Sequence, residues 1–149
     1  MKLHLEVVGR GAPELSSFER RYLDRLKYYV DIRIHEVSEG RGKQLGQRLR
    51  EEEERVLART GSKFVLFDQT GTLMSSSDWA KYFGAQAQGS KHCFVIGGPD
   101  GVSEKMRSAA SGCWSLSRLT FPHQLVRLMV LEQFFRAFSI LKGHPYHRS

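Results

Sequence analysis

The sequence predicts an α/β fold with a mostly parallel sheet and flanking helices. Strand-like and helix-like patterns alternate four times along the 149 residues, without repeats, linkers or low-complexity segments. Two of the strand-like runs, 63–68 and 92–96, are mostly apolar, as in parallel strands that are buried on both faces. We therefore expect a single domain over residues 1–149, which is long enough to bury a sizeable core.

The first half of the chain supplies two strand–helix pairs. Lys2–Val8 alternates between apolar and other residues and ends at Gly9, which predicts a strand. Apolar residues then recur three or four apart from Glu14 to Tyr29, with basic residues between them, which predicts an amphipathic helix with a basic outer face. Ile32–Val37 is the second predicted strand, and Leu45–Leu57 lies on the second predicted helix.

A basic loop with two glycines, Glu39–Lys43, precedes the second helix. Its glycine spacing differs from that of nucleotide triphosphatases, and no Ser or Thr follows its lysine, which argues against a triphosphate site. Contact of this loop with RNA phosphates and a plain solvated connection are both open. We expect the acidic run Glu51–Glu54 to form a solvated helix face rather than a metal site, with the pairs Glu51–Arg55 and Arg48–Glu52 each across one turn.

The second half continues the same alternation. Lys63–Asp68 is a strand that ends in a carboxylate, and a turn at Gln69–Gly71 is expected to follow it. Ser75–Asp78 is expected to cap the next helix. His92–Ile96 is another buried strand, and Gly112–Leu119 is expected to be the fifth strand.

The last predicted helix, Gln124–Lys142, is apolar on nearly all sides. Such a helix should be buried from more than one direction, and in a small domain a partner subunit is a reasonable source of that cover. Arg127 falls among apolar positions of this helix. It is expected either to form a structural ion pair or to point at a bound anion.

The net charge of +7 and the pI near 9.7 favour a polyanionic partner. No apolar run approaches the length of a membrane span, and the N-terminus lacks the apolar stretch of a signal peptide, so we expect a cytoplasmic protein without membrane contact. Cys93 and Cys113 are expected to be small buried residues on neighbouring strands rather than a disulfide or a metal pair.

Three motifs carry the chemistry: Phe94–Ser103, Trp114–His123 and the tail His144–Arg148. Glycines after a buried strand let the backbone approach a ligand at the carboxyl end of the sheet, although a purely structural tight turn is equally compatible. The tail combines two imidazoles, a phenol and a guanidinium, which suit proton transfer, stacking and anion recognition. No further ligand cluster accompanies its histidines, so no metal is expected.

The motifs IGGPDG, WSLSRLTFPHQLVR and HPYHR, in this order and with a long helix between the last two, resemble the bacterial ribosomal large-subunit methyltransferase H family of the SPOUT class. The resemblance covers the whole chain. It implies a homodimeric enzyme that uses S-adenosyl-L-methionine to methylate N3 of a pseudouridine in 23S rRNA, on assembled ribosomes rather than on DNA. It also implies a C-terminal trefoil knot, although knots are nearly absent from proteins in general.

The resemblance further implies a donor-binding set and a catalytic set. The donor-binding residues would be Phe67, Gly97, Gly98, Leu116, Ser117, Arg118, Leu119, Thr120 and Phe121. Phe67 stands where the family is expected to have leucine. The catalytic candidates would be His144, Tyr146, His147 and Arg148, supplied by the same subunit or by the opposite one, with His147 as the hypothetical base and Arg136 as a possible RNA contact.

Two other functions stay open from the residues alone. A ribosome-associated RNA-binding protein without catalysis would explain the charge equally well, and it would bind no methyl donor. A related methyltransferase that acts on a different RNA site, such as a ribose hydroxyl or tRNA, would share the donor pocket and differ only in its product.

Overall fold

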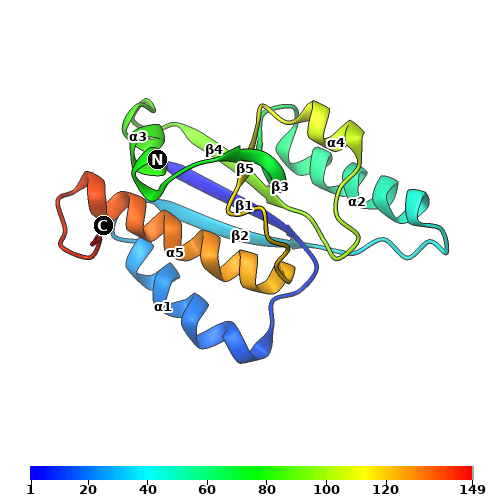
Figure 1. Cartoon of the computed structure of the whole chain (residues 1–149), viewed down its shortest axis with the longest axis horizontal. Coiled ribbons are helices and arrows are strands. Elements are labelled where there is room, and N and C mark those ends of the chain that lie inside the picture. Colours follow the sequence, from blue (N-terminus) through cyan, green and yellow to red (C-terminus); the bar gives the residue numbers. More distant parts are fainter. Residues whose placement is uncertain (149) are drawn as a thin grey trace.

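The computed structural model describes residues 1–148; Ser149, the last residue of the expected domain, lies outside the described residues. The five strands are β1 (Lys2–Val8), β2 (Asp31–Val37), β3 (Val65–Leu73), β4 (Lys91–Ile96) and β5 (Gly112–Ser115). They form one sheet in the order β2-β1-β4-β3-β5 (Figure 1). Every pair of neighbouring strands is parallel, which confirms the predicted sheet.

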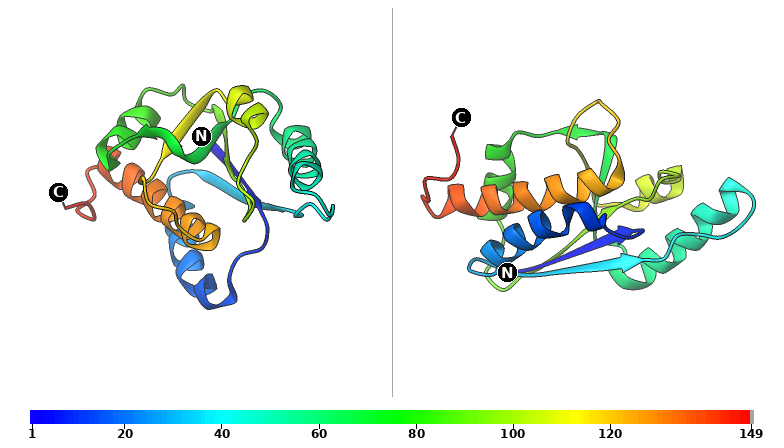
Figure 2. Two further views of the ribbon diagram at one scale, coloured as in Figure 1. Left: turned by 45° about the vertical axis from the view of Figure 1, so that its right-hand side comes forward. Right: turned by 90° about the horizontal axis from the view of Figure 1, so that it is seen from below.

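The helices cover both faces of this sheet. They are the short 3-10 helix η1 (Pro13–Leu15) and the α-helices α1 (Ser16–Leu26), α2 (Leu45–Thr60), α3 (Ser76–Gly84), α4 (Glu104–Ala109) and α5 (His123–Leu141). Helix α5 packs between α1 and α3 on one face, while α2 and α4 lie on the other (Figure 2). Within residues 1–148, no helix combines the length and the apolar character that a membrane crossing requires.

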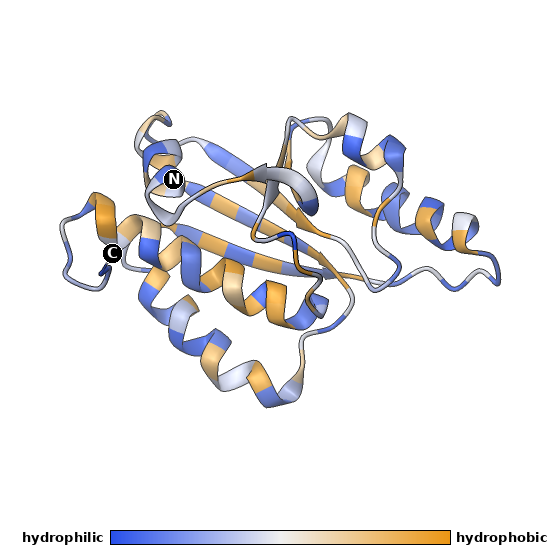
Figure 3. Ribbon diagram, viewed as in Figure 1, coloured by the Kyte–Doolittle hydropathy of each residue, from blue (hydrophilic) through white to orange (hydrophobic). Residues whose placement is uncertain are grey.

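The alternation in β1 assigns its side chains to two separate cores. Leu3, Leu5 and Val7 face α5 and belong to the larger core, whereas Val8 belongs to the smaller core beneath α2. Figure 3 shows the resulting stripes of hydrophobic and hydrophilic residues along the strands. The larger core is rich in stacked and edge-on aromatic rings, namely Phe67, Trp79, Phe83, Phe94, Trp114, Phe134 and Phe138.

The strands β3 and β5 differ from the prediction. Strand β3 does not stop at a turn after Asp68; it continues to Leu73 and pairs with β5 on both sides of an irregularity between Phe67 and Thr72. The close approach requires Gly71, because a Cβ there would lie 2.7 Å from the carbonyl carbon of Cys113. Strand β5 ends at Ser115 rather than Leu119.

The acidic run on α2 is only partly solvated: Glu54 is exposed, and Glu51 lies 4.0 Å from Arg55 as predicted. Glu52 and Glu53 are buried, and the Glu52 carboxylate accepts a hydrogen bond from the Gly40 amide at 2.8 Å. Glu51 likewise accepts from the Arg41 amide at 2.8 Å. These carboxylates therefore hold the basic loop 39–43 against α2, a long-range contact that helical spacing cannot reveal.

Three further expectations need correction. The helix expected from Glu14 begins as η1 and α1 ends at Leu26, before Tyr29. Arg48 pairs with Asp100 at 2.9 Å instead of with Glu52. Cys93 and Cys113 are half-buried rather than fully buried, and they lie on β4 and β5, which β3 separates, so their strands are not neighbours.

Candidate functional site

A cleft opens at the carboxyl ends of β3 and β4, beside the start of α5. Its volume is about 750 Å³, within the usual range for small-molecule sites. Three chain segments line it: 67–70 at the bend of β3, 96–101 after β4, and most of 116–123 after β5; Arg107 and Val126 complete the lining. Ligands of open α/β sheets bind at this edge.

The glycine turn forms one wall of the cleft. The Gly101 amide donates to the Gly98 carbonyl at 3.0 Å, and Gly101 has a φ of +76°, which favours glycine. A Cβ on Gly97 would lie 2.7 Å from Val102 Cγ1, and one on Gly98 would lie 2.8 Å from Val8 Cγ1. The backbone is thus pressed against the core. Ser103 caps α4 as predicted, since its Oγ accepts from the Met106 amide at 3.1 Å.

The loop after β5 forms the opposite wall, and hydrogen bonds hold it to β3. Ser115 Oγ donates to the Ser117 carbonyl at 2.8 Å, and the Leu119 amide donates to Ser117 Oγ at 3.0 Å, so the chain turns where a strand was expected. Thr120 Oγ1 donates to Gln69 Oε1 at 2.8 Å. The Arg118 guanidinium also donates a hydrogen bond to the Gln69 carbonyl oxygen.

The structure brings the predicted donor-binding residues together, with one exception. All of them except Arg118 line the cleft. Arg118 is exposed, and its guanidinium donates to the Gln69 carbonyl at the β3 bend. Phe67 is only 7% exposed and stacks on Trp79, with ring centroids 5.5 Å apart, so it offers the cleft an edge of the aromatic core.

Asp68 and Arg107 are charged cleft residues that the sequence motifs did not identify. Arg107 Nε donates to the Asp68 carboxylate at 3.3 Å, and the Thr70 amide donates to it at 3.1 Å. Burial raises the pKa of Asp68, but the hydrogen bonds from Thr70 and Arg107 outweigh burial and bring the pKa below its ordinary value. The carboxylate that ends the apolar run 63–68 was the available signal, because it places a charge at the carboxyl edge of the sheet.

The tail lies at the other end of α5, away from the cleft (Figure 2). Helix α5 has 19 residues, so its ends are about 27 Å apart. The Tyr146 hydroxyl donates to Glu132 Oε1 at 3.1 Å, and Arg136 Nη1 lies 3.1 Å from His147 Nδ1. His144 and Arg148 are exposed. Within one chain, therefore, none of the four catalytic candidates lines the cleft.

The contacts of the tail constrain its proton chemistry. Burial, together with Tyr22 and Glu132, raises the pKa of Tyr146 well above its ordinary value, so this phenol stays protonated at neutral pH. Arg136 is always a donor, so His147 Nδ1 accepts its hydrogen bond. The Arg136 guanidinium is also held by Glu132 at 2.6 Å and lies 4.8 Å from the centroid of the Tyr146 ring.

Arg127 forms the structural ion pair that was one of its two expected arrangements. Its Nε donates to Glu19 of α1 at 3.0 Å and its Nη1 donates to Glu36 of β2 at 2.6 Å. Among residues 1–148, no group of three or more His, Cys, Asp or Glu side chains is arranged to hold a metal ion.

Comparison with known proteins identifies the family. Residues 1–147 match the family model described as "Predicted SPOUT methyltransferase". The chain is 36% identical over 157 residues to "Ribosomal RNA large subunit methyltransferase H" of Syntrophobacter fumaroxidans, covering 99% of this chain and 100% of that one. It is 41% identical over 160 residues to the protein of the same name from Rhodopseudomonas palustris strain BisB5, covering 100% of both.

A solved structure shares the fold. A probable methylase family protein from Haemophilus influenzae Rd KW20 superposes with a TM-score of 0.54, covering 99% of this chain and 70% of that one. The two sequences are 10% identical, so this likeness concerns the fold alone.

Proposed function

The chain belongs to the SPOUT methyltransferase family, and we propose that it transfers a methyl group from S-adenosyl-L-methionine to N3 of a pseudouridine in 23S rRNA. The observation that carries the proposal is the convergence of one family's motif residues on a single cleft of about 750 Å³. The name shared by relatives that are 36% and 41% identical supports large-subunit rRNA as the substrate. The net charge of +7 favours the same partner.

The cleft suits a methyl donor that is part aromatic and part charged. Ile96, Leu116 and Phe121 supply apolar surface, while the glycine turn leaves room for close backbone approach. The Asp68 carboxylate and the Arg107 guanidinium lie at the same cleft and suit the polar end of such a ligand. When bound, S-adenosyl-L-methionine would supply an activated methyl group on its sulfonium.

The chain itself must align the N3 nucleophile and accept its proton. In our proposal the tail residues His144, Tyr146, His147 and Arg148 do this at the cleft of a partner subunit, because α5 separates them from their own cleft. His147 is the proposed base once Arg136 releases its Nδ1. A His147→Ala enzyme with an unchanged single-turnover rate would remove this role, and Tyr146→Phe tests the phenol in the same assay.

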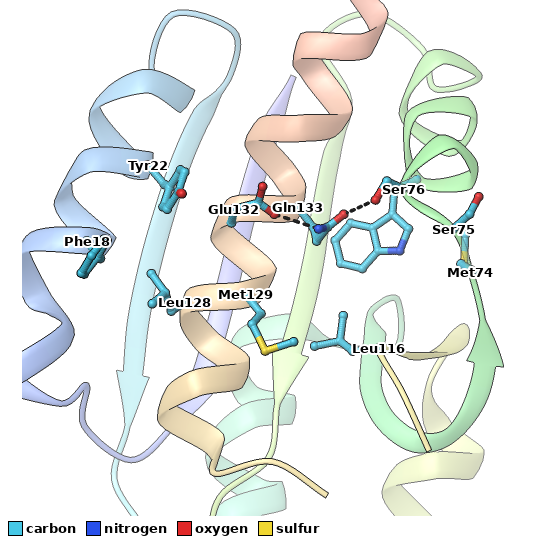
Figure 4. Close-up of a pocket in the computed structure, with 11 residues that line it drawn as sticks. Phe18, Tyr22, Met74, Ser75, Ser76, Leu116, Leu128, Met129, Glu132 and Gln133 are labelled. Carbon is cyan, nitrogen blue, oxygen red and sulfur yellow. Dashed lines mark hydrogen bonds between the residues drawn. The ribbon is translucent and has the colours of Figure 1, made fainter. Parts of the chain in front are cut away.

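The proposed homodimer has a partly apolar groove to bury. The groove has a volume of about 550 Å³ and lies between α1, α3 and α5 (Figure 4). Phe18, 47% exposed, stands on its α1 side, and Leu128 and Met129 on α5 form its floor. Sedimentation equilibrium tests the proposal: Met129→Glu should convert a dimer to monomers, whereas Leu45→Ala, at an exposed site on α2, should leave the dimer intact.

We also propose that the C-terminal part is threaded as a trefoil knot. The pairing of β5 with both halves of β3 supports this, as do the bonds from Arg118 and Thr120 to Gln69. In the proposal, residues 1–149 form one methyltransferase domain that acts in the cytoplasm on assembled ribosomes.

Methyl transfer from labelled S-adenosyl-L-methionine to ribosomes that lack the modification is the deciding experiment. Free 23S rRNA runs in parallel, and mass mapping locates the product. We expect label at one pseudouridine, on ribosomes only. Donor binding without label would redirect the search to another RNA site, and the absence of donor binding in calorimetry would favour an RNA-binding protein without catalysis.

A cleft variant ties that activity to the site. Leu119 lines the cleft and is 68% exposed, so its truncation should not disturb folding. Leu119→Ala should weaken donor binding by about tenfold, the value of burying much of one leucine side chain. Leu45→Ala, 50% exposed on α2, is the matched control and should bind donor like the wild type.

A further inference from the structure

A further pocket lies at the far end of α5, separate from the proposed donor cleft and from the groove between α1, α3 and α5. Its volume is about 450 Å³. We call it the aromatic pocket, and it is lined by Arg25, Tyr28, Tyr29, Phe135, His144 and Tyr146. These residues come from the end of α1, from the turn that follows it, from α5 and from the tail, which meet at one end of the molecule (Figure 1).

The inner rings of the aromatic pocket are fixed in place. Phe135 is 4% exposed, and its ring centroid lies 4.7 Å from that of Tyr146 at an interplanar angle of 66°. The Tyr29 ring also packs against the Phe135 ring, with centroids 6.2 Å apart. The His144 amide donates to the Ser139 carbonyl at 2.9 Å, which anchors the tail where it turns over the pocket. A ligand therefore meets a preformed surface rather than a mobile one.

Tyr28 differs from these packed rings, because its side chain lies in solvent. It is 89% exposed, the highest exposure among the large hydrophobic side chains of the described chain. An exposed ring beside a preformed aromatic surface offers a flat face with no intramolecular use. Unpaired RNA bases bind to such faces, because every base has a π-face and stacking tolerates any sequence.

The charges around the aromatic pocket select an anionic partner. Among residues 1–148 no carboxylate lines it, and the neighbouring Glu132 carboxylate is bound by the Tyr146 hydroxyl and by Arg136. The Arg25 guanidinium lies 5.6 Å from the centroid of the Phe135 ring, and no ion pair among residues 1–148 involves Arg25. Arg20 and Arg21 continue the exposed basic surface along α1. An apolar peptide would leave these cations without a partner, whereas a nucleotide satisfies both the rings and the charges.

We propose that the aromatic pocket binds one unpaired base of the RNA substrate, stacked against Tyr28, with Arg25 on an adjacent phosphate. The proposal rests on the proposed function and names a contact that positions the RNA. His144 and Tyr146 belong both to this pocket and to the proposed catalytic tail, so a base held here brings the RNA to that tail. It is not the methylated base of its own subunit, since the cleft is about one length of α5 away.

Variants of Tyr28 test the stacking. With saturating donor, Tyr28→Ala should raise the KM for ribosomes roughly 5- to 150-fold, the range for loss of one stacked base, and leave kcat within about twofold. Tyr28→Phe keeps the ring and should keep the KM. An alanine variant with wild-type KM overturns the proposal, as does a phenylalanine variant as impaired as the alanine one.

A direct binding measurement separates this proposal from the proposed function. The probe is a fluorescein-labelled single-stranded RNA of eight adenosines, followed by anisotropy at low salt. Tyr28→Ala should weaken its binding to the full-length protein by a similar factor. If that loss appears while the wild type methylates no ribosome, the methyl-transfer proposal fails and the base-binding site stands; if no variant changes the anisotropy, the base-binding site fails alone.

Charge-matched variants exclude a mere loss of net charge. Arg25→Gln and Arg20→Gln each remove one exposed cation from α1, but only Arg25 lines the aromatic pocket. Arg25→Gln should weaken RNA binding several-fold more than Arg20→Gln. If the two variants weakened RNA binding equally, the proposed contact between Arg25 and a phosphate would be wrong. Dissociation of a wild-type dimer by Tyr28→Ala, seen by sedimentation, would show that a second protein copy occupies the pocket, and this also overturns the proposal.

Discussion

Arg127 joins three elements through two carboxylates. It projects from α5 to Glu19 on α1 and to Glu36 on β2, and its side chain is 11% exposed. Glu19 is itself buried, and its Oε2 has no hydrogen-bond partner. Burial raises the pKa of Glu19, and Arg127 lowers it by a smaller amount. The ion pair therefore opposes the protonation of Glu19 that burial favours.

Arg127→Ala should lower the free energy of unfolding by about 3–5 kcal/mol, because it leaves the buried Glu19 carboxylate without its cation. Urea unfolding followed by tryptophan fluorescence measures this. Arg20→Ala, at an exposed position of α1, should change the unfolding free energy by less than about 0.5 kcal/mol. An Arg127→Ala loss no larger than that of Arg20→Ala would mean that α1 holds to α5 through apolar packing alone.

Glu36 gives stability a dependence on acid. The hydrogen bond from the Gly11 amide, at 2.7 Å, is the main reason that its pKa lies below the ordinary value, and Arg127 adds to this. Because the folded-state pKa is depressed, Glu36 contributes stability above its unfolded pKa of about 4.3, and this contribution disappears as pH falls through the folded pKa. The contribution of Glu19 to the pH dependence of stability has the opposite sign, because its folded-state pKa is raised and its contribution is lost as pH rises.

Glu36→Gln should therefore lower the melting temperature near neutral pH, and the gap from the wild type should close below about pH 4. Thermal unfolding by circular dichroism across that range measures the gap. Glu14→Gln, at an exposed position, is the control and should follow the wild type throughout. A gap that stays constant down to about pH 3 would show that the hydrogen bond to Gly11 does not depend on the charge of Glu36.

At the scale of elements, the contact between β3 and β5 shapes the cleft. Strand β3 bends after Phe67 and pairs again with β5 beyond the bend. Segment 67–70 at the bend lines the cleft, and Gln69 receives the loop that follows β5. Two walls of the cleft therefore depend on one close approach of the backbones at Gly71.

Gly71→Ala should separate these strands, because the new Cβ would meet the backbone of Cys113 at 2.7 Å. Overpacking of this kind costs about 1–3 kcal/mol, and donor affinity should fall with it. Urea unfolding and calorimetry measure the two effects. Gly46→Ala in α2, where the nearest atom belongs to the flexible Arg50 side chain at 3.4 Å, should lose neither stability nor donor binding. If Gly71→Ala bound the donor with wild-type affinity, the shape of the cleft would not depend on this contact.

At the scale of the whole molecule, the cleft and the tail occupy opposite ends of α5. The groove between α1, α3 and α5 lies along this helix, and the aromatic pocket lies at the end that carries the tail. This arrangement supports the proposed second subunit as the partner of the tail, since within one chain the length of α5 separates the tail from the cleft.

If the chain is knotted as proposed, its extended length should be shorter when it is pulled from its two ends. Stretched from its two ends, an unknotted chain of 149 residues reaches about 500 Å. A trefoil tightens instead of opening, so the unfolded contour should stop measurably short of that length in an optical trap. Trapping the chain through Lys2 and Ser90 should give full extension for the enclosed residues, because that part precedes β5. Full extension from end to end would exclude the knot.

The sequence by itself determined the order and type of the elements. Apolar periodicity and capping residues act over a few neighbours, so strands β1, β2 and β4, the caps Ser75 and Ser103 and the long helix α5 follow from local patterns, whereas β3 and β5 end elsewhere than predicted. The family resemblance named the cleft residues that follow β4 and β5, with Arg118 as the exception, whereas the structure added Asp68 and Arg107. Segments that follow different strands meet in this cleft because parallel strands place their carboxyl ends at one edge.

Only the tertiary structure decided which distant groups meet. The bend of β3 approaches the backbone of Cys113, Glu51 and Glu52 on α2 bind the amides of loop 39–43, and Arg127 binds carboxylates on two other elements. These contacts join residues far apart in the chain, and no local period encodes them. The distance between tail and cleft has the same origin, because the length of a continuous α5, rather than any motif, keeps them apart.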